Sequence, residues 1–454
     1  MILLTHGYFL EDDEKEKAIM RPYVPLGILY IAAYLDSKGI ENTVTDTTFS
    51  SFEQFKKTLL QSPPKIIGIY TNLMTKISVL RTIAFIKSQP ALKHCKVVLG
   101  GPEIRYNAAN YLQHGADLLV IGEGEETFFE ICNSFQTTGN IDETIHGTAF
   151  IKGEEIIFTP ERTLIRDINT LPMPARHKID LTLYGNAWKK HHGYSMYSLS
   201  TMRGCPYTCK WCSRAVYGGT YRRRSAKLVV DEMANLQQNY QPDQIWFVDD
   251  VFTINHKWLR EFRDEIVKRG IKIPYEIITR ADRMSDEVID ILKETGCFRV
   301  WIGAESGSQK IIDAMDRRVD VKMVRENIIK TKKAGIEAGT FIMLGYPGED
   351  RNDIKETIVH LKESNPSFYT ITVAYPITGT PLYEEVNGAM QVPGPWESVT
   401  DRDYDFKRLH SKTYYKYAID WVNHEVNLSR AKNLKEKLKY KGKSWVAQAK
   451  MLLS

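Results

Sequence analysis

Short apolar segments alternate with amphipathic helical segments twice along this 454-residue chain, and this alternation constrains the fold more than any other feature. In the first half, the expected strands are 1–5, 42–46, 66–70, 96–100 and 117–122. Helical periodicity marks 26–38, 51–61, 76–88, 103–114 and 125–136. Because such strands are apolar throughout, they favour a parallel sheet covered on both faces. We expect residues 1–137 to form a doubly wound, Rossmann-like α/β domain with its ligand site at the carboxyl ends of the strands.

The second alternation begins near residue 196. Strands are expected within 195–202, 244–250, 275–279, 298–303, 339–345 and 369–375. Amphipathic helices are expected at 225–239, 256–269, 285–295, 321–334 and 351–364. Six β/α units in a row predict a partial (β/α)6 TIM-like barrel over 196–385, and active sites of such barrels lie at the carboxyl ends of the strands.

Two regions lie outside the alternations. Residues 138–195 read as a short hairpin followed by an irregular connector, which the prolines of "LPMP" stiffen. Residues 386–454 read as a C-terminal helical region with one or two basic helices. Its Lys-rich run is most simply a solvated helix face, and a surface for an acidic partner is the alternative.

Charge and hydropathy limit the possible locations and partners. A formal net charge of +5 over this length is mild, so we expect no nucleic-acid partner. The longest apolar run, Pro25 to Leu35, is about half of what a bilayer span requires, so we expect no membrane contact. The start of the chain turns acidic within a dozen residues, unlike a signal peptide. The expected location is the cytoplasm.

Three of the six cysteines lie in "RGCPYTCKWCSR", with the spacing C-x3-C-x2-C: Cys205, Cys209 and Cys212. The other three are scattered among apolar neighbours and read as small buried side chains. In a cytoplasmic protein a tight cysteine cluster favours metal binding over disulfides. A structural zinc site would need a fourth ligand, which the spacing does not supply. An iron-sulfur cluster held by three cysteines instead leaves one iron open to a small molecule.

The string "CPYTCKWC", opening the first loop of a six-unit β/α barrel, resembles the signature of the radical S-adenosylmethionine (SAM) enzymes. Further strings resemble the subgroup that carries an N-terminal cobalamin-binding domain: "WFVDDVFTINHKW", "TRAD", "WIGAESGSQ", "MLGYPGE" and "YPITGTPLY" in the barrel, and "PLGILYIAAYL", "GGPE" and "GEGEET" before it. The resemblance covers about residues 1–385. It implies a 4Fe-4S cluster, SAM and cobalamin as cofactors.

The resemblance also assigns roles to individual residues. It makes Cys205, Cys209 and Cys212 the cluster ligands, and Trp211, Asp249, Asp250, Arg280, Glu305, Ser306 and Gly345 the contacts to SAM. Carboxylates can accept hydrogen bonds from an ammonium and from ribose hydroxyls, while an arginine fork matches a carboxylate. Charged residues at strand ends also pair with one another or cap the next helix, and that reading stays open.

Cobalamin contacts are expected at the strand ends of the first domain: Thr71, Asn72, Gly100, Gly101, Glu123 and Gly124. The glycines could instead serve only tight turns. The motif D-x-H-x-x-G, whose histidine coordinates cobalt in many cobalamin domains, is absent, and His6 is the nearest candidate. The run "YRRRS" at 221–225 could bind an anionic substrate or the corrin phosphate, or be a solvated loop.

The implied function is that of a cobalamin-dependent radical SAM methyltransferase. It would act through a 5'-deoxyadenosyl radical on an unactivated carbon or phosphorus of a small-molecule or natural-product substrate. Its electrons would come from a donor such as flavodoxin or ferredoxin. The same architecture could instead run a rearrangement, cyclisation, dehydration or carbon-carbon coupling, with or without cobalamin. A non-enzymatic corrinoid-binding protein is the alternative of another class.

Overall fold

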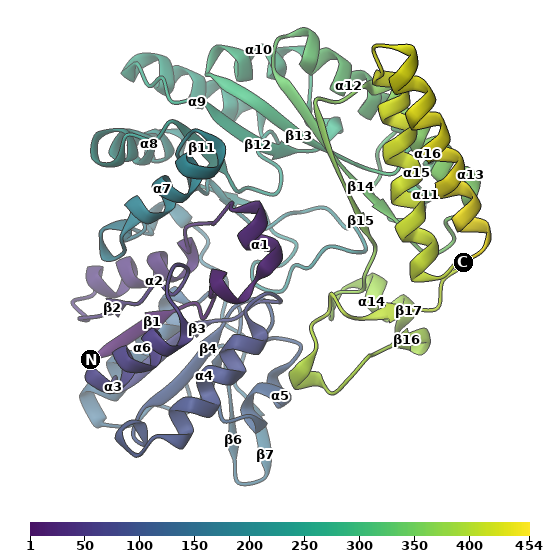
Figure 1. The fold of residues 1–454 in the computed structure, drawn as a ribbon. Coiled ribbons are helices and arrows are strands. Elements are labelled where there is room, and N and C mark those ends of the chain that lie inside the picture. Colours follow the sequence, from purple (N-terminus) through teal and green to yellow (C-terminus); the bar gives the residue numbers. More distant parts are fainter. The chain divides into compact units, whose positions relative to one another are not determined.

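The computed structural model describes residues 1–454, which divide into two compact units (Figure 1). Unit 1 comprises Met1–Pro206, Ser213–Trp246 and Val392–Tyr404. Unit 2 comprises Tyr207–Cys212, Phe247–Gln391 and Asp405–Ser454. The chain therefore passes between the units five times. No helix combines the length and the apolar character that crossing a bilayer requires.

Unit 1 is built on a seven-stranded sheet with the order β2-β1-β3-β4-β5-β6-β7. The strands are β1 (Ile2–Thr5), β2 (Thr43–Val44), β3 (Ile66–Tyr70), β4 (Lys96–Gly100), β5 (Leu118–Val120), β6 (Thr148–Lys152) and β7 (Glu155–Phe158). The first five pair in parallel, and β6 and β7 are antiparallel. The order reverses between β1 and β3, which makes their carboxyl ends the switch point at which doubly wound folds bind ligands.

Both faces of this sheet are buried, as the apolar strands predict. Alternate residues of β1 point to opposite sides, so Leu4 packs in one core and Leu3 in the other. The first core contains residues of α2 (Leu26–Ser37), α6 (Glu125–Thr138) and α7 (Leu181–His192), and the second contains residues of α3 (Phe52–Gln61), α4 (Lys76–Ser88) and α5 (Ala108–Gln113). The predicted doubly wound domain is confirmed.

The connector is more regular than its sequence suggests. The hairpin β6-β7 extends the first sheet beyond β5. The irregular stretch expected after it contains α7, which begins after the N-cap Asp180 and ends at Gly193 in a left-handed conformation. Unit 1 also contains α1 (Glu14–Ile19), α8 (Ala226–Tyr240) and the two-stranded ladder of β9 (Met202–Arg203) with β10 (Arg222–Arg223).

The segment 392–404 belongs to unit 1 although the chain on both sides of it belongs to unit 2. Trp396 anchors it: its Nε1 donates to Asn107 Oδ1 at 3.0 Å, and its ring meets that of Tyr111 edge-on at 4.9 Å. The ammonium of Lys76 lies 3.9 Å from the centre of the same ring and donates no hydrogen bond within the protein. We call residues 392–404 the strap.

The second sheet has six strands in the order β8-β11-β12-β13-β14-β15. These are β8 (Met196–Leu199), β11 (Gln244–Phe247), β12 (Tyr275–Thr279), β13 (Cys297–Glu305), β14 (Glu337–Leu344) and β15 (Phe368–Val373). The pairs from β12 to β15 are parallel. Six strands in sequence order, each followed by a helix or a loop, are the expected partial barrel.

The helices of unit 2 are α9 (His256–Arg269), α10 (Asp286–Glu294), α11 (Gln309–Ala314), α12 (Val321–Lys333), α13 (Arg351–Ser364), α14 (Pro381–Val386), α15 (Lys412–Arg430) and α16 (Leu434–Leu452). Short strands β16 (Met390–Gln391) and β17 (Asp405–Phe406) pair on either side of the strap. The C-terminal region is two helices, α15 and α16, which lie side by side as a hairpin (Figure 1).

Candidate active site

The three clustered cysteines lie on the loop 204–221 between β9 and β10. None of the six cysteines forms a disulfide. The loop starts at Gly204, whose φ is +80° and whose hypothetical Cβ would lie 2.4 Å from the Thr220 carbonyl oxygen, so only glycine fits there. Cys209 is buried, whereas Cys205 and Cys212 are half-buried. In unit 2, the Cys212 N–H donates to the Cys209 carbonyl at 3.2 Å, which curls the chain between these two ligand candidates.

Two buried arginines surround the sulfur of Cys209. Arg280 Nη1 and Arg317 Nη1 each lie 3.7 Å from Cys209 Sγ as hydrogen-bond donors. Two guanidinium donors therefore face the sulfur of Cys209, and cysteine sulfur is the usual ligand of iron-sulfur clusters. No group of three or more His, Cys, Asp and Glu side chains is gathered as a single metal ion would require. The donor chemistry at Cys209 thus fits a thiolate ligand of an iron-sulfur cluster.

Arg280 directly follows β12 and is engaged within unit 2. Its guanidinium stacks over the Tyr207 ring at 3.8 Å, its Nε donates to Asp282 at 2.9 Å and its Nη2 donates to the Arg317 carbonyl at 2.7 Å. The fork expected to meet a SAM carboxylate therefore already has three hydrogen-bond acceptors within the protein, namely Asp282, the Arg317 carbonyl and the Cys209 sulfur. These contacts match the alternative in which charged residues at strand ends pair with one another.

Glu305 ends β13 in a left-handed conformation with a φ of +64°, which is rare for a residue with a side chain. Such backbone strain gathers at functional sites. Arg317 Nη2 lies 3.5 Å from Glu305 Oε1 and donates to the Gly303 carbonyl at 2.7 Å. Burial raises the pKa of Glu305, and the nearby positive charges of Arg317 and Arg280 act in the opposite direction. A buried carboxyl whose ion partner, Arg317, is 3.5 Å away can still accept hydrogen bonds from a hydroxyl or ammonium ligand.

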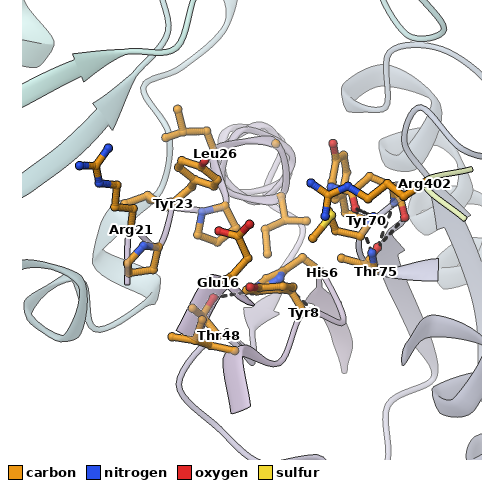
Figure 2. Close-up of a pocket in the computed structure, with 18 of the residues that line it drawn as sticks. His6, Tyr8, Glu16, Arg21, Tyr23, Leu26, Thr48, Tyr70, Thr75 and Arg402 are labelled. Carbon is orange, nitrogen blue, oxygen red and sulfur yellow. Dashed lines mark hydrogen bonds between the residues drawn. The ribbon is translucent and has the colours of Figure 1, made fainter. Parts of the chain in front are cut away.

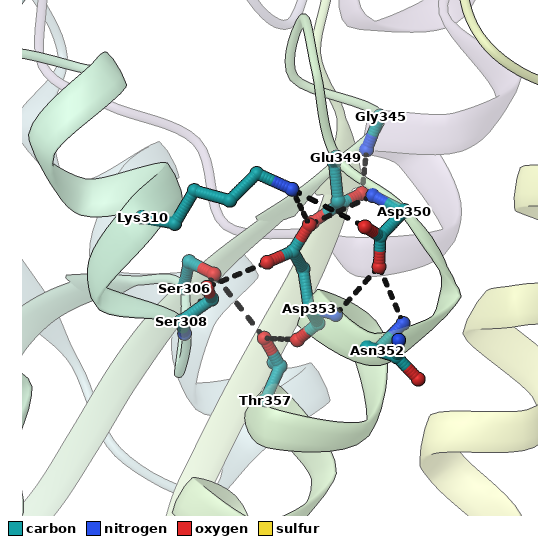
Figure 3. Close-up of polar contacts among 9 residues, drawn as sticks. All are labelled: Ser306, Ser308, Lys310, Gly345, Glu349, Asp350, Asn352, Asp353 and Thr357. Atoms are coloured by element: carbon teal, nitrogen blue, oxygen red, sulfur yellow. Dashed lines mark hydrogen bonds and ion pairs between the residues drawn. The ribbon is translucent and has the colours of Figure 1, made fainter.

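Gly345 follows β14 in a turn with a φ of +76° (Figure 3). Its N–H donates to the buried Glu349 carboxyl, and its carbonyl accepts from Arg408 Nη1 at 2.8 Å. A hypothetical Cβ on Gly345 would lie 2.7 Å from that Nη1 atom, so a larger residue would displace Arg408. Both polar backbone groups of Gly345 are therefore engaged within unit 2, and the closeness of Arg408 requires a glycine at this position.

Ser306 belongs to a hydrogen-bond network beside the turn (Figure 3). Its hydroxyl lies 3.3 Å from the Thr357 hydroxyl and accepts from the Ser308 N–H at 3.1 Å, while Ser308 Oγ donates to Asp353 at 2.7 Å. Ser306, a predicted SAM contact, therefore also forms hydrogen bonds that hold the end of β13 in place.

The remaining SAM candidates lie on neighbouring segments of unit 2. Asp249 and Asp250 follow β11 after one intervening residue, Val248; Asp249 is buried and Asp250 is exposed. The Arg317 guanidinium lies 5.6 Å from the centre of the Trp211 ring. Asp249, Arg280, Glu305 and Gly345 therefore come from the carboxyl ends of four consecutive strands of the second sheet.

A cavity of about 490 Å³ opens at the switch point of the first sheet (Figure 2). It is lined mainly by aromatic and apolar side chains with a few polar groups: His6, Tyr8, Leu10, Glu16, Arg21, Pro22, Tyr23, Val24, Pro25, Leu26, Gly27, Ile28, Thr48, Tyr70, Asn72, Met74, Thr75, Tyr217 and Arg402. Burial raises the pKa of Tyr70 to about 12, so its phenol is neutral at pH 7. Such a lining fits the apolar rim and amide side chains of a corrin ring.

His6 lines this cavity but has no ring nitrogen to spare. Its Nδ1 accepts from the Tyr8 N–H at 3.3 Å, and its Nε2 donates to Asp46 at 2.9 Å. Burial acts to raise the pKa of Asp46, but the hydrogen bonds from His6, Thr48 and Tyr184 hold it below its usual value. The donor set therefore fits cobalamin without a protein imidazole on cobalt.

The other expected cobalamin contacts have mixed surroundings. Asn72 lines the cavity, and Thr71 is buried behind it. Gly101, just after Gly100 at the end of β4, has a φ of +117°, and its hypothetical Cβ would lie 2.3 Å from the Thr71 carbonyl oxygen. Glycine is thus required at Gly101 by the close approach of two protein segments.

Glu123, which precedes Gly124 at the N-terminus of α6, is enclosed by basic residues. Its Oε1 accepts from Arg203 at 2.8 Å, and its Oε2 accepts from Arg222 at 2.7 Å and from the Ile165 N–H at 2.8 Å. The expectation that 221–225 forms a solvated or ligand-binding basic run is not met at two of its arginines, because Arg222 and Arg224 form ion pairs inside unit 1.

Sequence reasoning missed two further groups. Arg317 lies after α11, and the string "DRRVD" carries no signal that separates it from solvated charges. Glu16, Arg21 and Arg402 line the cavity, and Arg402 comes from the strap, more than 300 residues beyond the strands it faces. Only the tertiary structure brings these residues to their sites.

Two family models match the chain. The model of the radical SAM superfamily matches residues 199–361, and the model of the B12 binding domain matches residues 20–131. The chain belongs to the radical SAM superfamily and carries an N-terminal B12-binding domain. It is therefore a radical SAM enzyme by family, and its two domains imply a 4Fe-4S cluster, SAM and cobalamin.

Similar curated proteins include an uncharacterized methyltransferase of Pyrococcus horikoshii, 28% identical over 85% of this chain and 83% of that protein. The cytidylyl-2-hydroxyethylphosphonate methyltransferase of Streptomyces wedmorensis is 24% identical over 86% of this chain and 88% of that protein. The anaerobic magnesium-protoporphyrin IX monomethyl ester cyclase of Cereibacter sphaeroides is 26% identical over 81% of this chain, which spans 60% of its length.

Solved structures share the fold at low identity. The cobalamin-dependent SAM radical enzyme OxsB, with aqua-cobalamin and SAM bound, matches 100% of this chain and 72% of its own at a TM-score of 0.76 and 16% identity. The radical SAM methyltransferase TsrM from Kitasatospora setae, with tryptophan and a SAM analog bound, matches 87% of this chain and 79% of its own at a TM-score of 0.71 and 16% identity.

Proposed function

We propose that this protein is a cobalamin-dependent radical SAM methyltransferase that acts on an unactivated carbon or phosphorus of a small molecule. One observation carries the proposal: a three-cysteine loop that follows β8, the first strand of a six-stranded sheet, lies in the same chain as a B12-binding domain. Methyltransferases among the similar proteins match most of the chain in length, which supports the same reaction type here.

In this proposal the chain's own residues bind and orient the cofactors. Cys205, Cys209 and Cys212 hold the cluster, and Arg280 and Arg317 donate to the Cys209 sulfur. When bound, the cluster and SAM supply a 5'-deoxyadenosyl radical that removes a hydrogen from the substrate, and cobalamin supplies the methyl group.

SAM contacts are proposed at the strand ends. The carboxylates of Asp249, Asp250 and Glu305 accept from the methionine ammonium and the ribose hydroxyls, and Trp211 packs against the adenine. The turn at Gly345, held by Glu349 and Arg408, is proposed to pack against the adenine. Ser306 and Arg280 act mainly as support for these groups, since their polar atoms have protein partners.

Cobalamin is proposed to bind at the switch-point cavity of unit 1. Asn72 and Tyr70 line it, Thr71, Gly100 and Gly101 shape the backbone beneath, and Gly124 lies at the next strand end. Glu123 contributes through the arginines it holds. The proposal further includes a small-molecule substrate, an electron donor such as flavodoxin or ferredoxin, and a cytoplasmic location.

A radical reaction without methyl transfer is the second candidate. The similarity to a protoporphyrin monomethyl ester cyclase favours it, because that protein, which matches 81% of this chain, is named as a cyclase and not as a methyltransferase. The two candidate reactions differ in whether a methyl group from SAM is transferred to the substrate.

The first experiment measures corrinoid binding. Protein purified and reconstituted without oxygen is loaded with hydroxocobalamin, freed of excess by gel filtration, and examined by visible absorption. We expect a stoichiometric corrin band beside the iron-sulfur shoulder, and reduced, loaded protein incubated with SAM should yield methylcobalamin. Protein that retains its cluster but binds no corrinoid would refute the methyltransferase proposal.

The second experiment tests the cluster. Replacing Cys205, Cys209 and Cys212 together by alanine should abolish reductive cleavage of SAM to 5'-deoxyadenosine, measured by liquid chromatography. Cys95→Ala is the matched control, because Cys95 is a buried thiol in the hydrophobic core of unit 1. If the triple variant still formed 5'-deoxyadenosine, the assignment of the cluster to these residues would be wrong.

A further inference from the structure

Helix α16 presents a stripe of large apolar side chains to solvent. Leu434, Leu438, Trp445 and Leu452 are 71%, 63%, 63% and 72% exposed. At 3.6 residues per turn, these four positions fall within an arc of about 40° on the helix surface. Gly442 and Ala449 lie on the same side and are also exposed. The stripe therefore runs along the whole 19-residue helix, with Lys441 at its edge, about 40° from its centre line.

The other side of α16 is the one that packs within unit 2. Ser444, Ala447 and Met451 are its buried residues, and Ser444 Oγ donates to Glu425 of α15 at 2.6 Å. The exposed stripe lies on the side away from α15 and is not part of this packing. Exposed apolar side chains gathered in one stripe mark an interaction surface, unlike the same residues scattered singly.

Lysines flank the stripe on both sides. Exposed lysines of the segment are Lys432, Lys435, Lys437, Lys439, Lys441, Lys443 and Lys450, whereas Glu436 is the only acidic residue from 432 to 454. Lys441 Nζ lies 5.3 Å from the centre of the Trp445 ring, so an aromatic ring and an ammonium share the edge of the stripe. The exposed lysines agree with the solvated helix face expected from the sequence, and they lie beside the apolar stripe.

We propose that this face of α16 binds the surface of an anionic lipid bilayer, with the helix lying in the plane of the membrane. The leucines and Trp445 would enter the boundary between headgroups and acyl chains, and the flanking lysines would contact the headgroup phosphates. Tryptophan and lysine side chains are enriched at this boundary because each combines an apolar body with a polar tip.

Charge complementarity selects this partner over a second copy of the chain. Two α16 helices packed stripe to stripe would bring rows of lysines together with almost no carboxylates to pair with them. An anionic lipid surface complements the apolar centre and both basic edges at once. The contact would be peripheral, because no helix of the protein can cross a bilayer.

The test uses the full-length reconstituted protein and sucrose-loaded vesicles of phosphatidylcholine alone or with 30 mol% phosphatidylglycerol. Sedimentation gives the partition coefficient. We expect binding to the anionic vesicles that weakens as NaCl rises. Replacing Lys435, Lys439 and Lys441 by glutamine should lower the coefficient on the order of 100-fold, because each lysine near an anionic surface changes binding about fivefold.

Two further variants separate the apolar contact from general charge. Leu438→Ser combined with Trp445→Ser should lower partitioning at least about tenfold with the charge unchanged. The control replaces three exposed lysines of other segments, Lys268, Lys272 and Lys333, by glutamine and should partition within about twofold of the wild type. Thermal unfolding verifies that all variants are folded, which exposed positions should permit.

The proposal is overturned if the wild type does not bind anionic vesicles or binds neutral ones equally well. It is also overturned if the α16 variants and the control variant lose binding alike. If the α16 substitutions instead change the molar mass in light scattering, or abolish binding of an acidic flavodoxin without any effect on vesicle binding, the stripe is a protein interface and the lipid proposal fails.

Discussion

Replacing Trp396 by alanine tests how the strap is held on unit 1. The indole contacts the Lys76 ammonium, the Tyr111 ring and Asn107 Oδ1, and the centre of the His114 ring also lies 5.5 Å from its own; alanine makes none of these contacts. A cation-π contact away from water is worth about 2 kcal/mol, an edge-on aromatic pair about 1 kcal/mol and a hydrogen bond about 1 kcal/mol. We therefore expect Trp396→Ala to lower the free energy of unfolding of unit 1 by about 4 kcal/mol, or its melting temperature by roughly 10 °C.

Lys76 makes the effect specific. Its side chain is fully buried, and the Trp396 ring is the contact its ammonium makes in place of a hydrogen bond. Burial lowers the pKa of Lys76, and the nearby carboxyls of Glu103 and Asp401 oppose that shift. Trp396→Phe keeps an aromatic face but loses the N–H, so it should cost about 1 to 2 kcal/mol.

Calorimetry and limited trypsin digestion measure the outcome. In Trp396→Ala, cleavage after Arg402 should accelerate, because a strap that leaves its site exposes its backbone. Trp445→Ala, which removes an indole that is 63% exposed, should change the unfolding free energy by less than about 0.5 kcal/mol. If Trp396→Ala behaved like this control in both assays, the reasoning from the ring contacts would be refuted.

Two further substitutions test the strand ends. Gly101→Ala should destabilise unit 1 by more than about 2 kcal/mol in a thermal melt, because its Cβ would meet the Thr71 carbonyl and its φ is +117°; an unchanged melt would exclude the close approach. Burial raises the pKa of Glu349 to about 8, so the folded protein keeps a proton that the unfolded chain loses above about pH 4.5, and stability falls as pH rises towards 8. Glu349→Gln, whose side-chain oxygen can still accept from the Gly345 N–H, removes this loss of stability. The difference in melting temperature between the variant and the wild type should therefore grow in favour of the variant up to about pH 8 and stay constant above it. A difference that stays constant over the whole pH range would contradict the assignment.

The strands were predictable because a sheet that is buried on both faces has apolar residues all along each strand. The helices were predictable because their apolar residues recur with a period of 3.6 residues. The strand 66–70 and the helix 76–88 have the predicted bounds in the structure. Helix α7 was not predicted because Gly185 interrupts its helical pattern. Glycine is needed there for tertiary packing, since a Cβ at this position would lie 2.4 Å from Tyr197 Oη. The N-cap Asp180 and the terminal Gly193 were the local signals that could have identified it.

Site residues were predictable to the extent that sequence neighbours act together. The cysteine loop is recognisable because its ligand candidates lie within eight positions of one another. Arg317 and Arg402 are not recognisable, since their partners lie roughly 100 and more than 300 residues away in the chain. The arginines near 222 were misread for the same reason: the basic run gives no sign that a buried carboxylate far away in the sequence, such as Glu123, pairs with it.

Because the chain crosses between the two units five times, a chimera of this protein and a relative cannot exchange unit 1 as one continuous segment. A chimera that exchanges residues 1–206 and leaves the rest untouched would separate Lys76, Asn107 and Tyr111 from the tryptophan that they contact, because the strap is encoded almost 200 codons downstream. The inherited module is therefore discontinuous, and a viable graft of unit 1 must carry residues 213–246 and 392–404 with it.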